Sequence, residues 1–385
     1  MRPRLKPGLR RLWRDPSTLQ IGTDPGRAVV LGGLEPRVAG LVDLLDGTRD
    51  EPAILAAARS RGLDPGQLWR LVDLLDACGT LEDASTDPAP PAGLPPAEWD
   101  RLAPDLAALS LRSRAADGGL GALARRRAAA VEVRGAGRVG ATLAVLLAAA
   151  GVGSVRALDP APTRPCDVAA GGLLAEDVGR PRQDAAADAV RRVSPANTGR
   201  GGTPPSLVVL APVSTLSSRH AGGLRARPHL AVWVREGRGV VGPLVLPGAS
   251  SCLHCHDLHR RDRDPQWPMI AAQLATDPIG MPACEATLAM AVAALGAAQA
   301  LSHLDGEPAS TAVDGTLEVS LPDLLVRRRS WQPHPECPCR MQARSLAARA
   351  EPPGPPASPA SPPSPPSPPS ATVSGTTPSS VSWAG

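Results

Sequence analysis

The sequence lacks several common residue types, and each absence excludes some chemistry. Among its 385 residues there is no phenylalanine or tyrosine, and Lys6 and Asn197 are the only lysine and asparagine. Dehydrogenases with a Tyr–Lys acid pair are therefore excluded, and so is a Walker A lysine in a core domain, because Lys6 lies near the N-terminus. The core must be built from leucine, valine and alanine with a few tryptophans.

The charge balance does not indicate a nucleic-acid partner. The chain has 41 basic residues against 37 acidic ones, a net charge of +4, which is ordinary for this length. The missing residue types share A- and T-rich codons, so the excess of arginine over lysine reflects a G+C-rich gene.

The chain shows no sequence signal for a membrane or for secretion. The most apolar run, 141–152, is too short to span a bilayer, and the basic N-terminus leads into no apolar segment. Four of the seven cysteines form two tight pairs, which is typical of metal ligation in a reducing compartment. We expect a cytoplasmic protein without a nucleic-acid or membrane partner.

Residues 1–84 have the pattern of a small α+β domain. Strand-like runs at 18–23 and 27–33 are separated by an Asp-Pro-Gly turn, which predicts a β-hairpin. Helical patterns follow at 36–45, 51–61 and 64–78, and Asp50 and Asp64 are the predicted N-caps of the last two. A hairpin followed by three short helices is typical of a winged-helix-like domain.

The rest of the chain divides into three parts by composition. Residues 85–97 form a proline-rich linker, and residues 98–349 alternate strand-like with helical patterns, which predicts an α/β domain. Residues 350–385 are rich in proline and serine, so we expect a disordered tail with polyproline II character.

A glycine-rich loop opens the α/β domain. A predicted strand at 129–133 leads into Gly135, Gly137 and Gly140 in the spacing G-x-G-x-x-G, then into a helix and a second strand that ends at Asp159. Glycines let the backbone approach phosphates, and an acid at this distance can bind ribose hydroxyls. The pattern predicts a nucleotide-binding Rossmann-like unit; the alternative is the same fold with an empty pocket.

Two cysteine pairs predict a metal site. Cys252 and Cys255 form a C-x-x-C pair, and Cys337 and Cys339 form a C-x-C pair about 80 residues later. Four thiolates complete a closed tetrahedral site, so we expect structural rather than catalytic zinc. The alternatives are unbound thiols or histidine substitutes, for which the neighbouring candidates are His254, His256, His259 and His334. Cys284 begins a predicted helix, but no base is identifiable for it, so we do not expect it to be catalytic.

The loop and both cysteine pairs together resemble the ThiF/MoeB-type adenylyltransferases, which are related to ubiquitin-activating enzymes. The resemblance covers about 110–340: GAGRVGATLAVLLAAAGVGSVRALD resembles the nucleotide loop, DVGRPRQDAA a D-x-G-x-x-K stretch, and SSCLHC and PHPECPC the zinc pairs. It implies ATP with magnesium and structural zinc as cofactors, and a homodimer. It also implies phosphate contacts for the three loop glycines, ribose contact for Asp159, and Arg182 at the place of the phosphate lysine.

The chain departs from this family where the family performs catalysis. Arg138 stands where the loop usually has glycine, and Ala211 and Pro212 stand where an aspartate that organises the magnesium-bound triphosphate is expected. These departures remove electrostatic stabilisation that adenylation needs. We therefore name no catalytic residue and do not expect efficient adenylation.

The first unit resembles the PqqD-type recognition elements of peptide natural-product biosynthesis, most specifically in LLDGTRD at 44–50. That resemblance implies binding of the leader of a ribosomal precursor peptide, through a strand edge and a helix groove; a generic winged helix or a dimerisation arm is the alternative. The leading hypothesis is a protein that binds the leader and presents the peptide to a modifying enzyme such as a cyclodehydratase. An active adenylyltransferase acting on a peptide or carrier-protein C-terminus and an NAD- or FAD-dependent oxidoreductase are the other two.

Overall fold

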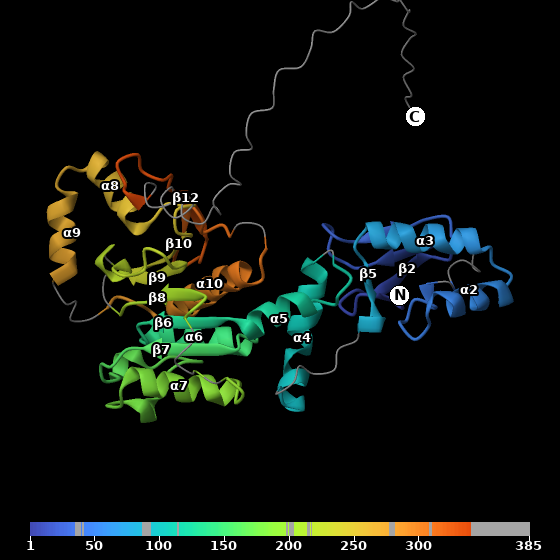
Figure 1. Cartoon of the computed structure of the whole chain (residues 1–385), viewed down its shortest axis with the longest axis horizontal. Coiled ribbons are helices and arrows are strands. Elements are labelled where there is room, and N and C mark those ends of the chain that lie inside the picture. The colour runs from blue at the N-terminus through green and yellow to red at the C-terminus, as the bar shows by residue number, and fades with distance from the viewer. Residues whose placement is uncertain are drawn as a thin grey trace, which may run out of the picture. The chain divides into compact units, whose positions relative to one another are not determined.

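The structure is a computed structural model that describes residues 1–34, 40, 42–86, 94–113, 115–197, 199, 204–213, 216, 218–276, 282–307 and 310–339. The tail predicted at 350–385 and most of the linker lie outside these residues. Figure 1 shows the arrangement of the elements. Residues 1–344 form one compact unit, and the predicted boundaries between the front domain, the linker and the body stay predictions.

The front part of the chain contains two small antiparallel sheets. β2 (Arg11–Asp15), β3 (Thr18–Ile21) and β4 (Val29–Leu31) form one, and β1 (Pro3–Leu5) pairs with β5 (Leu81–Asp83) in the other. Leu19 lies opposite Leu31, so the predicted hairpin is confirmed. The sequence reasoning did not find β2, because its basic and largely exposed residues have no apolar alternation.

Helices α2 (Glu51–Ser60) and α3 (Pro65–Ala77) follow as predicted. Asp50 accepts a hydrogen bond from the Ala53 N–H and Asp64 from that of Gln67, which confirms both N-caps. The helices and the three-stranded sheet share one apolar core. Of the helix predicted at 36–45, residues 36–39 and 41 lie outside the described residues.

The body is built on a seven-stranded mixed sheet in the order β12-β11-β10-β9-β8-β6-β7. Strands β6 (Ala130–Arg134), β7 (Ser154–Leu158), β8 (Leu207–Leu210) and β9 (His229–Arg235) are parallel. Strands β10 (Arg238–Val245), β11 (Gly315–Ser320) and β12 (Arg327–Ser330) continue the sheet in antiparallel fashion. The predicted α/β class with a Rossmann-like β-α-β unit is therefore confirmed.

Helices cover both faces of this sheet. α6 (Arg138–Ala149) and α10 (Ala286–Leu304) pack against each other and against the face that contains Val133, Val209 and Val232. Leu210, Ala231 and Trp233 face the other way, toward α8 (Leu253–Arg263). The remaining elements are α4 (Pro96–Arg112), α5 (Leu120–Ala128), α7 (Arg182–Val193), α9 (Trp267–Thr276), η1 (Ala84–Thr86), η2 (Pro165–Asp167), η3 (Ala175–Asp177) and η4 (Ser218–Ala221).

The apolar helix α10 belongs to the core. By length and composition it is the one described helix that could cross a membrane. However, Val292, Ala293, Ala297 and other residues along its length are buried against α6 and the sheet. Core packing therefore accounts for its apolar composition.

The single lysine has a structural role. Lys6 is 1% exposed, and its Nζ donates hydrogen bonds to the carbonyls of Ser110 and Ser113 at the C-terminal end of α4, each at 2.7 Å. A cation at this end of a helix satisfies carbonyls that have no partner within the helix. The ammonium group of Lys6 therefore stabilises the C-terminal end of α4.

Candidate functional site

The glycine loop lies close against the C-terminal end of β8, and two of its glycines are sterically required. Gly135 has a φ of +102°, and a Cβ there would come within 2.1 Å of the Ala211 carbonyl oxygen. A Cβ on Gly140 would come within 2.0 Å of the Gly135 carbonyl oxygen. Only glycine allows β6, the loop and α6 to approach this closely.

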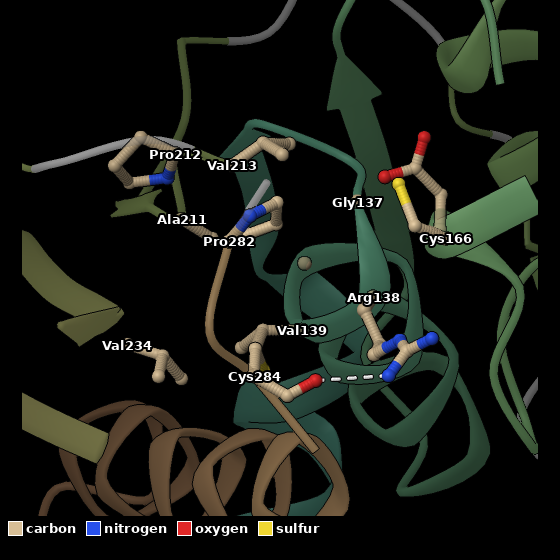
Figure 2. Close-up of a pocket in the computed structure, with 12 residues that line it drawn as sticks. Gly137, Arg138, Val139, Cys166, Ala211, Pro212, Val213, Val234, Pro282 and Cys284 are labelled. Carbon is tan, nitrogen blue, oxygen red and sulfur yellow. Dashed lines mark hydrogen bonds between the residues drawn. The ribbon is translucent and has the colours of Figure 1, made fainter. Parts of the chain in front are cut away.

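The loop and the first turn of α6 form one wall of a pocket. Figure 2 shows Gly137 near Val213, and Val139 beside Cys284 lower in the view, with Val234 to their left. The first N–H groups of a helix have no partner within the helix and favour an anion. The backbone at this wall therefore fits a phosphate or a carboxylate.

Asp159 and Arg182, the predicted ribose and phosphate contacts, lie together beside this pocket but contact each other. Arg182 is 6% exposed; its Nη1 lies 3.4 Å from Oδ2 of Asp159, and its Nε donates to Oδ2 of Asp167 at 2.8 Å. Asp159 also accepts a hydrogen bond from the Ala136 N–H within the glycine loop, at 3.0 Å. We call Asp159, Asp167 and Arg182 the Arg182 clamp.

The clamp has chemical consequences for the pocket. The guanidinium is balanced by two carboxylates, so it offers a nucleotide little net charge. Asp167 is the only acid among the described residues that line the pocket. Ala211 and Pro212 at the end of β8 add no carboxylate. The loop therefore fits a phosphate, and Oδ1 of Asp167 is the one carboxylate oxygen beside it that forms no hydrogen bond in the described part of the chain. Magnesium is usually held by one or two carboxylates together with phosphate oxygens, so this lining offers it a single protein ligand.

Arg138 and Cys284 close the pocket from the side of α10. Nη1 of Arg138 donates to the Cys284 carbonyl at 2.9 Å (Figure 2). Burial raises the pKa of the Cys284 thiol. A protonated thiol is a poor nucleophile. Sequence reasoning missed Asp167, because nothing in the local pattern connects it to Arg182.

The second site is a cluster of the four cysteine sulfurs. Cys252 and Cys255 lie at the N-terminal end of α8, and the segment after β12 brings Cys337 and Cys339 to them. Sγ of Cys252 lies 3.8 Å from that of Cys255 and 3.6 Å from that of Cys337, and Cys255 and Cys339 are 3.6 Å apart. Sulfurs around a tetrahedral zinc with bonds of about 2.3 Å lie about 3.8 Å apart, so the cluster fits that ion.

The thiols of the cluster differ in acidity. A hydrogen bond from the neighbouring Cys252 thiol holds the pKa of Cys255 down, at about 4, whereas burial raises the pKa of Cys339 to about 12. Burial also raises the pKa of Cys337. A divalent cation would favour the thiolate form of these cysteines, because thiolates are the form that binds metal.

The histidines considered as substitute ligands lie outside the four-sulfur cluster. His256 stacks on Trp331 with ring centroids 4.5 Å apart, and both of its ring nitrogens are without a partner among the described residues. His334 lies 2.7 Å from a carboxylate oxygen of Asp262, and His259 contacts the Gln332 carbonyl. His254 is exposed. The four sulfurs lie within 4.8 Å of one another and could hold a metal ion without any of these rings.

Comparisons with known proteins agree with this geometry. Residues 111–200 match the model of the ThiF family. No curated protein matches the sequence.

Solved structures with the same fold include MccB and PaaA. E. coli MccB with ATP is 14% identical, with a TM-score of 0.62 over 87% of this chain and 98% of its own. The microcin C7 biosynthetic enzyme MccB in complex with N-formylated MccA is also 14% identical, with a TM-score of 0.61 over 88% and 99% of the two chains. PaaA is 17% identical, with a TM-score of 0.60 over 84% and 99%. At these identities the likeness establishes a shared fold along nearly the whole length of those chains.

Proposed function

We propose that this protein takes part in the maturation of a ribosomally made peptide. The premise is the match of residues 111–200 to the ThiF family. The front unit of the protein binds the leader of the precursor, and the body presents the peptide to a modifying enzyme such as a cyclodehydratase. ATP-dependent adenylation is weak or lost. The working form is a cytoplasmic homodimer that contacts neither nucleic acid nor membrane.

The fold likeness supports a peptide partner. The similar structures include a biosynthetic enzyme of microcin C7 in complex with a peptide, N-formylated MccA. The likeness covers the front part as well as the body, since 88% of this chain aligns with 99% of that enzyme. A precursor peptide is therefore the partner class that fits the whole chain rather than its nucleotide unit alone.

The front part offers the surface that a leader would need. β4 is an edge strand of the three-stranded sheet, and the side chain of Val30 on it is 46% exposed. On α3, Leu74 is 48% exposed although its neighbours Leu71 and Leu75 are buried. An edge strand can pair with an extended peptide while an apolar helix face takes its side chains.

The proposal that adenylation is weak or lost is based on one observation, the Arg182 clamp. The cation at the place of the phosphate lysine is held by Asp159 and Asp167, and Ala211 stands at the end of β8 where a magnesium ligand would be expected. Phosphoryl and nucleotidyl transfer depend on cations that face the transferring phosphates. A bound nucleotide would contact the backbone of Gly137 and the first turn of α6, with Asp167 as the one carboxylate among the described lining residues.

We also propose that Cys252, Cys255, Cys337 and Cys339 hold a structural zinc ion. The ion would join the start of α8 to the segment that follows β12, across about 80 residues of sequence. Four thiolates leave no open position, so the ion would stabilise the fold and take no part in a reaction.

An active adenylyltransferase is the second candidate, and the open backbone wall at Gly137 favours it. An NAD- or FAD-dependent oxidoreductase has only the glycine loop in its favour. Pyrophosphate exchange with ATP, magnesium and each precursor peptide encoded near the gene separates the first two functions. Exchange that depends on a peptide would establish the second candidate, and no exchange is expected.

Leader binding is tested on the full chain with fluorescein-labelled leaders of the same precursors. Leu74→Asp should weaken binding at least ~10-fold, a loss of ~1.4 kcal/mol, because it places a charge on the proposed groove. Leu174→Asp is the matched control, since Leu174 lies in the body and is 37% exposed. Equal binding by both variants, or no leader binding by the unaltered chain, would count against the proposal.

A further inference from the structure

A second pocket lies between α9 and the sheet, on the face opposite the glycine pocket. Trp233 and Arg235 of β9, Arg260 of α8, and Trp267 and Ala271 of α9 contribute to its walls. We call it the α9 groove; α9 stands apart from the sheet beside α8 in Figure 1.

Helix α9 is apolar, yet its side chains are exposed or half-buried. None of its residues is buried, and Met269 and Ile270 are 64% and 39% exposed. Its first turn is held in place, because Nε1 of Trp267 donates to Asp257 at 3.1 Å and the Arg260 guanidinium lies 4.9 Å from the Trp267 ring centroid. Apolar surface of this kind, beside a pocket, is typical of a site that a ligand covers.

The groove carries more positive than negative charge. Arg235 and Arg260 line it, and Asp257 is the only acid among its described lining residues. Asp257 already accepts hydrogen bonds from Arg260 and from Trp267. Arg235 forms no ion pair with any residue in the described part of the chain. Burial lowers the pKa of the Arg260 guanidinium, and the charges of Arg235 and Arg329 add to this effect. A carboxylate would offset this excess charge.

The groove and the glycine pocket take lining residues from the same strand and the same loop. On β9, Val234 faces the glycine pocket while Trp233 and Arg235 face the groove. Residues 211–213 line the glycine pocket, and Leu216 and Ser218, a few residues later in the same loop, line the groove. The two sites are therefore built on neighbouring residues of the body.

We propose that the α9 groove binds a segment of the precursor peptide downstream of the leader, in which an acidic side chain is flanked by aliphatic ones. The carboxylate lies between Arg235 and Arg260, and the aliphatic groups pack on Trp267 and on the small residues of α9. This inference rests on the proposed function, because it takes a peptide as the partner.

Three acetylated and amidated pentapeptides test the groove on the full chain: GLELG, GLQLG and GLKLG. Calorimetry at low salt should give GLELG a dissociation constant ~10-fold below that of GLQLG, with GLKLG weakest, because only the carboxylate pairs with the arginines. Arg235→Glu should invert the order, and Arg235→Gln should remove the preference without inverting it. Arg238→Glu is the matched control, since Arg238 lies on the neighbouring strand, is 54% exposed and pairs with Glu318 instead.

Equal dissociation constants for the three peptides, or the same order with Arg235→Glu as with Arg238→Glu, would overturn the proposal. Leader binding, measured in the same samples, separates this failure from that of the proposed function. If the chain binds leaders but does not discriminate among the pentapeptides, the groove proposal is wrong and the proposed function stands. A chain that discriminates among the pentapeptides but binds no leader refutes the front-unit function and leaves the groove site in place.

Discussion

Replacing Arg182 with alanine tests whether this residue is part of the folded core or a ligand for phosphate. Arg182 is 6% exposed and bonds to Asp167, which is 2% exposed, at 2.8 Å. Removing one member of a buried ion pair costs ~3–5 kcal/mol, because the remaining charge is left unpaired. Asp167 keeps its hydrogen bond from the Arg164 N–H, at 2.8 Å, so we expect the lower end of this range, ~3 kcal/mol.

The assay is urea unfolding of the full chain, followed by the circular dichroism of its tryptophans. Arg191→Ala is the control, because Arg191 lies on the same helix α7, is 58% exposed and pairs with Asp188 at the surface. A surface pair contributes at most ~1 kcal/mol. If Arg182→Ala costs no more than the control, and instead abolishes ATP binding, Arg182 acts as a phosphate ligand and the interpretation of the clamp is wrong.

Three further predictions concern metal, packing and pH. Cys337→Ser should lower the zinc content from about one ion per chain to near zero, because the four-cysteine site would lose one thiolate ligand. Atomic absorption measures the zinc content, and an unchanged value would refute the four-cysteine site. Arg126→Ala should reduce the free energy of unfolding by ~3–5 kcal/mol, because the guanidinium donates to both carboxylate oxygens of buried Asp305, at 2.6 and 2.7 Å. Urea unfolding measures this change, and a loss below ~1 kcal/mol would contradict the prediction. Burial lowers the pKa of His229, so the unfolded chain binds the proton first and stability falls as the pH drops below about 6.5, the ordinary histidine value. His229→Gln should flatten part of that decrease in unfolding free energy between pH 7.5 and 5.5, and an unchanged slope would exclude His229 as its source.

Much of the fold could be predicted from the sequence because it depends on local rules. Asp50 and Asp64 cap the helices that follow them, since a short polar side chain can reach an N–H only three residues away. Gly135 and Gly140 mark the turn between β6 and α6, since no other residue fits so near the backbone. The edge strand β2 was not predicted, because charged residues on an exposed edge carry no alternating pattern.

The sequence by itself determined which chemistry was available to the candidate sites. It supplied one lysine, two cysteine pairs and a glycine loop followed by Asp159, and these fixed the residue types of both sites before any contact was known. The cysteine prediction fits the four-sulfur cluster because tight pairs already place two ligands on one turn.

Only the tertiary structure decided what Arg182 contacts and where the α9 groove lies. An arginine carries the same charge whether it faces a phosphate or a carboxylate, and its partners Asp159 and Asp167 lie 23 and 15 residues away in the sequence. Likewise, Arg235 lies on β9 and Trp267 on α9, and the two residues line one pocket only in the folded chain. Contacts between distant segments depend on how whole elements pack, and no local pattern of residues specifies that packing.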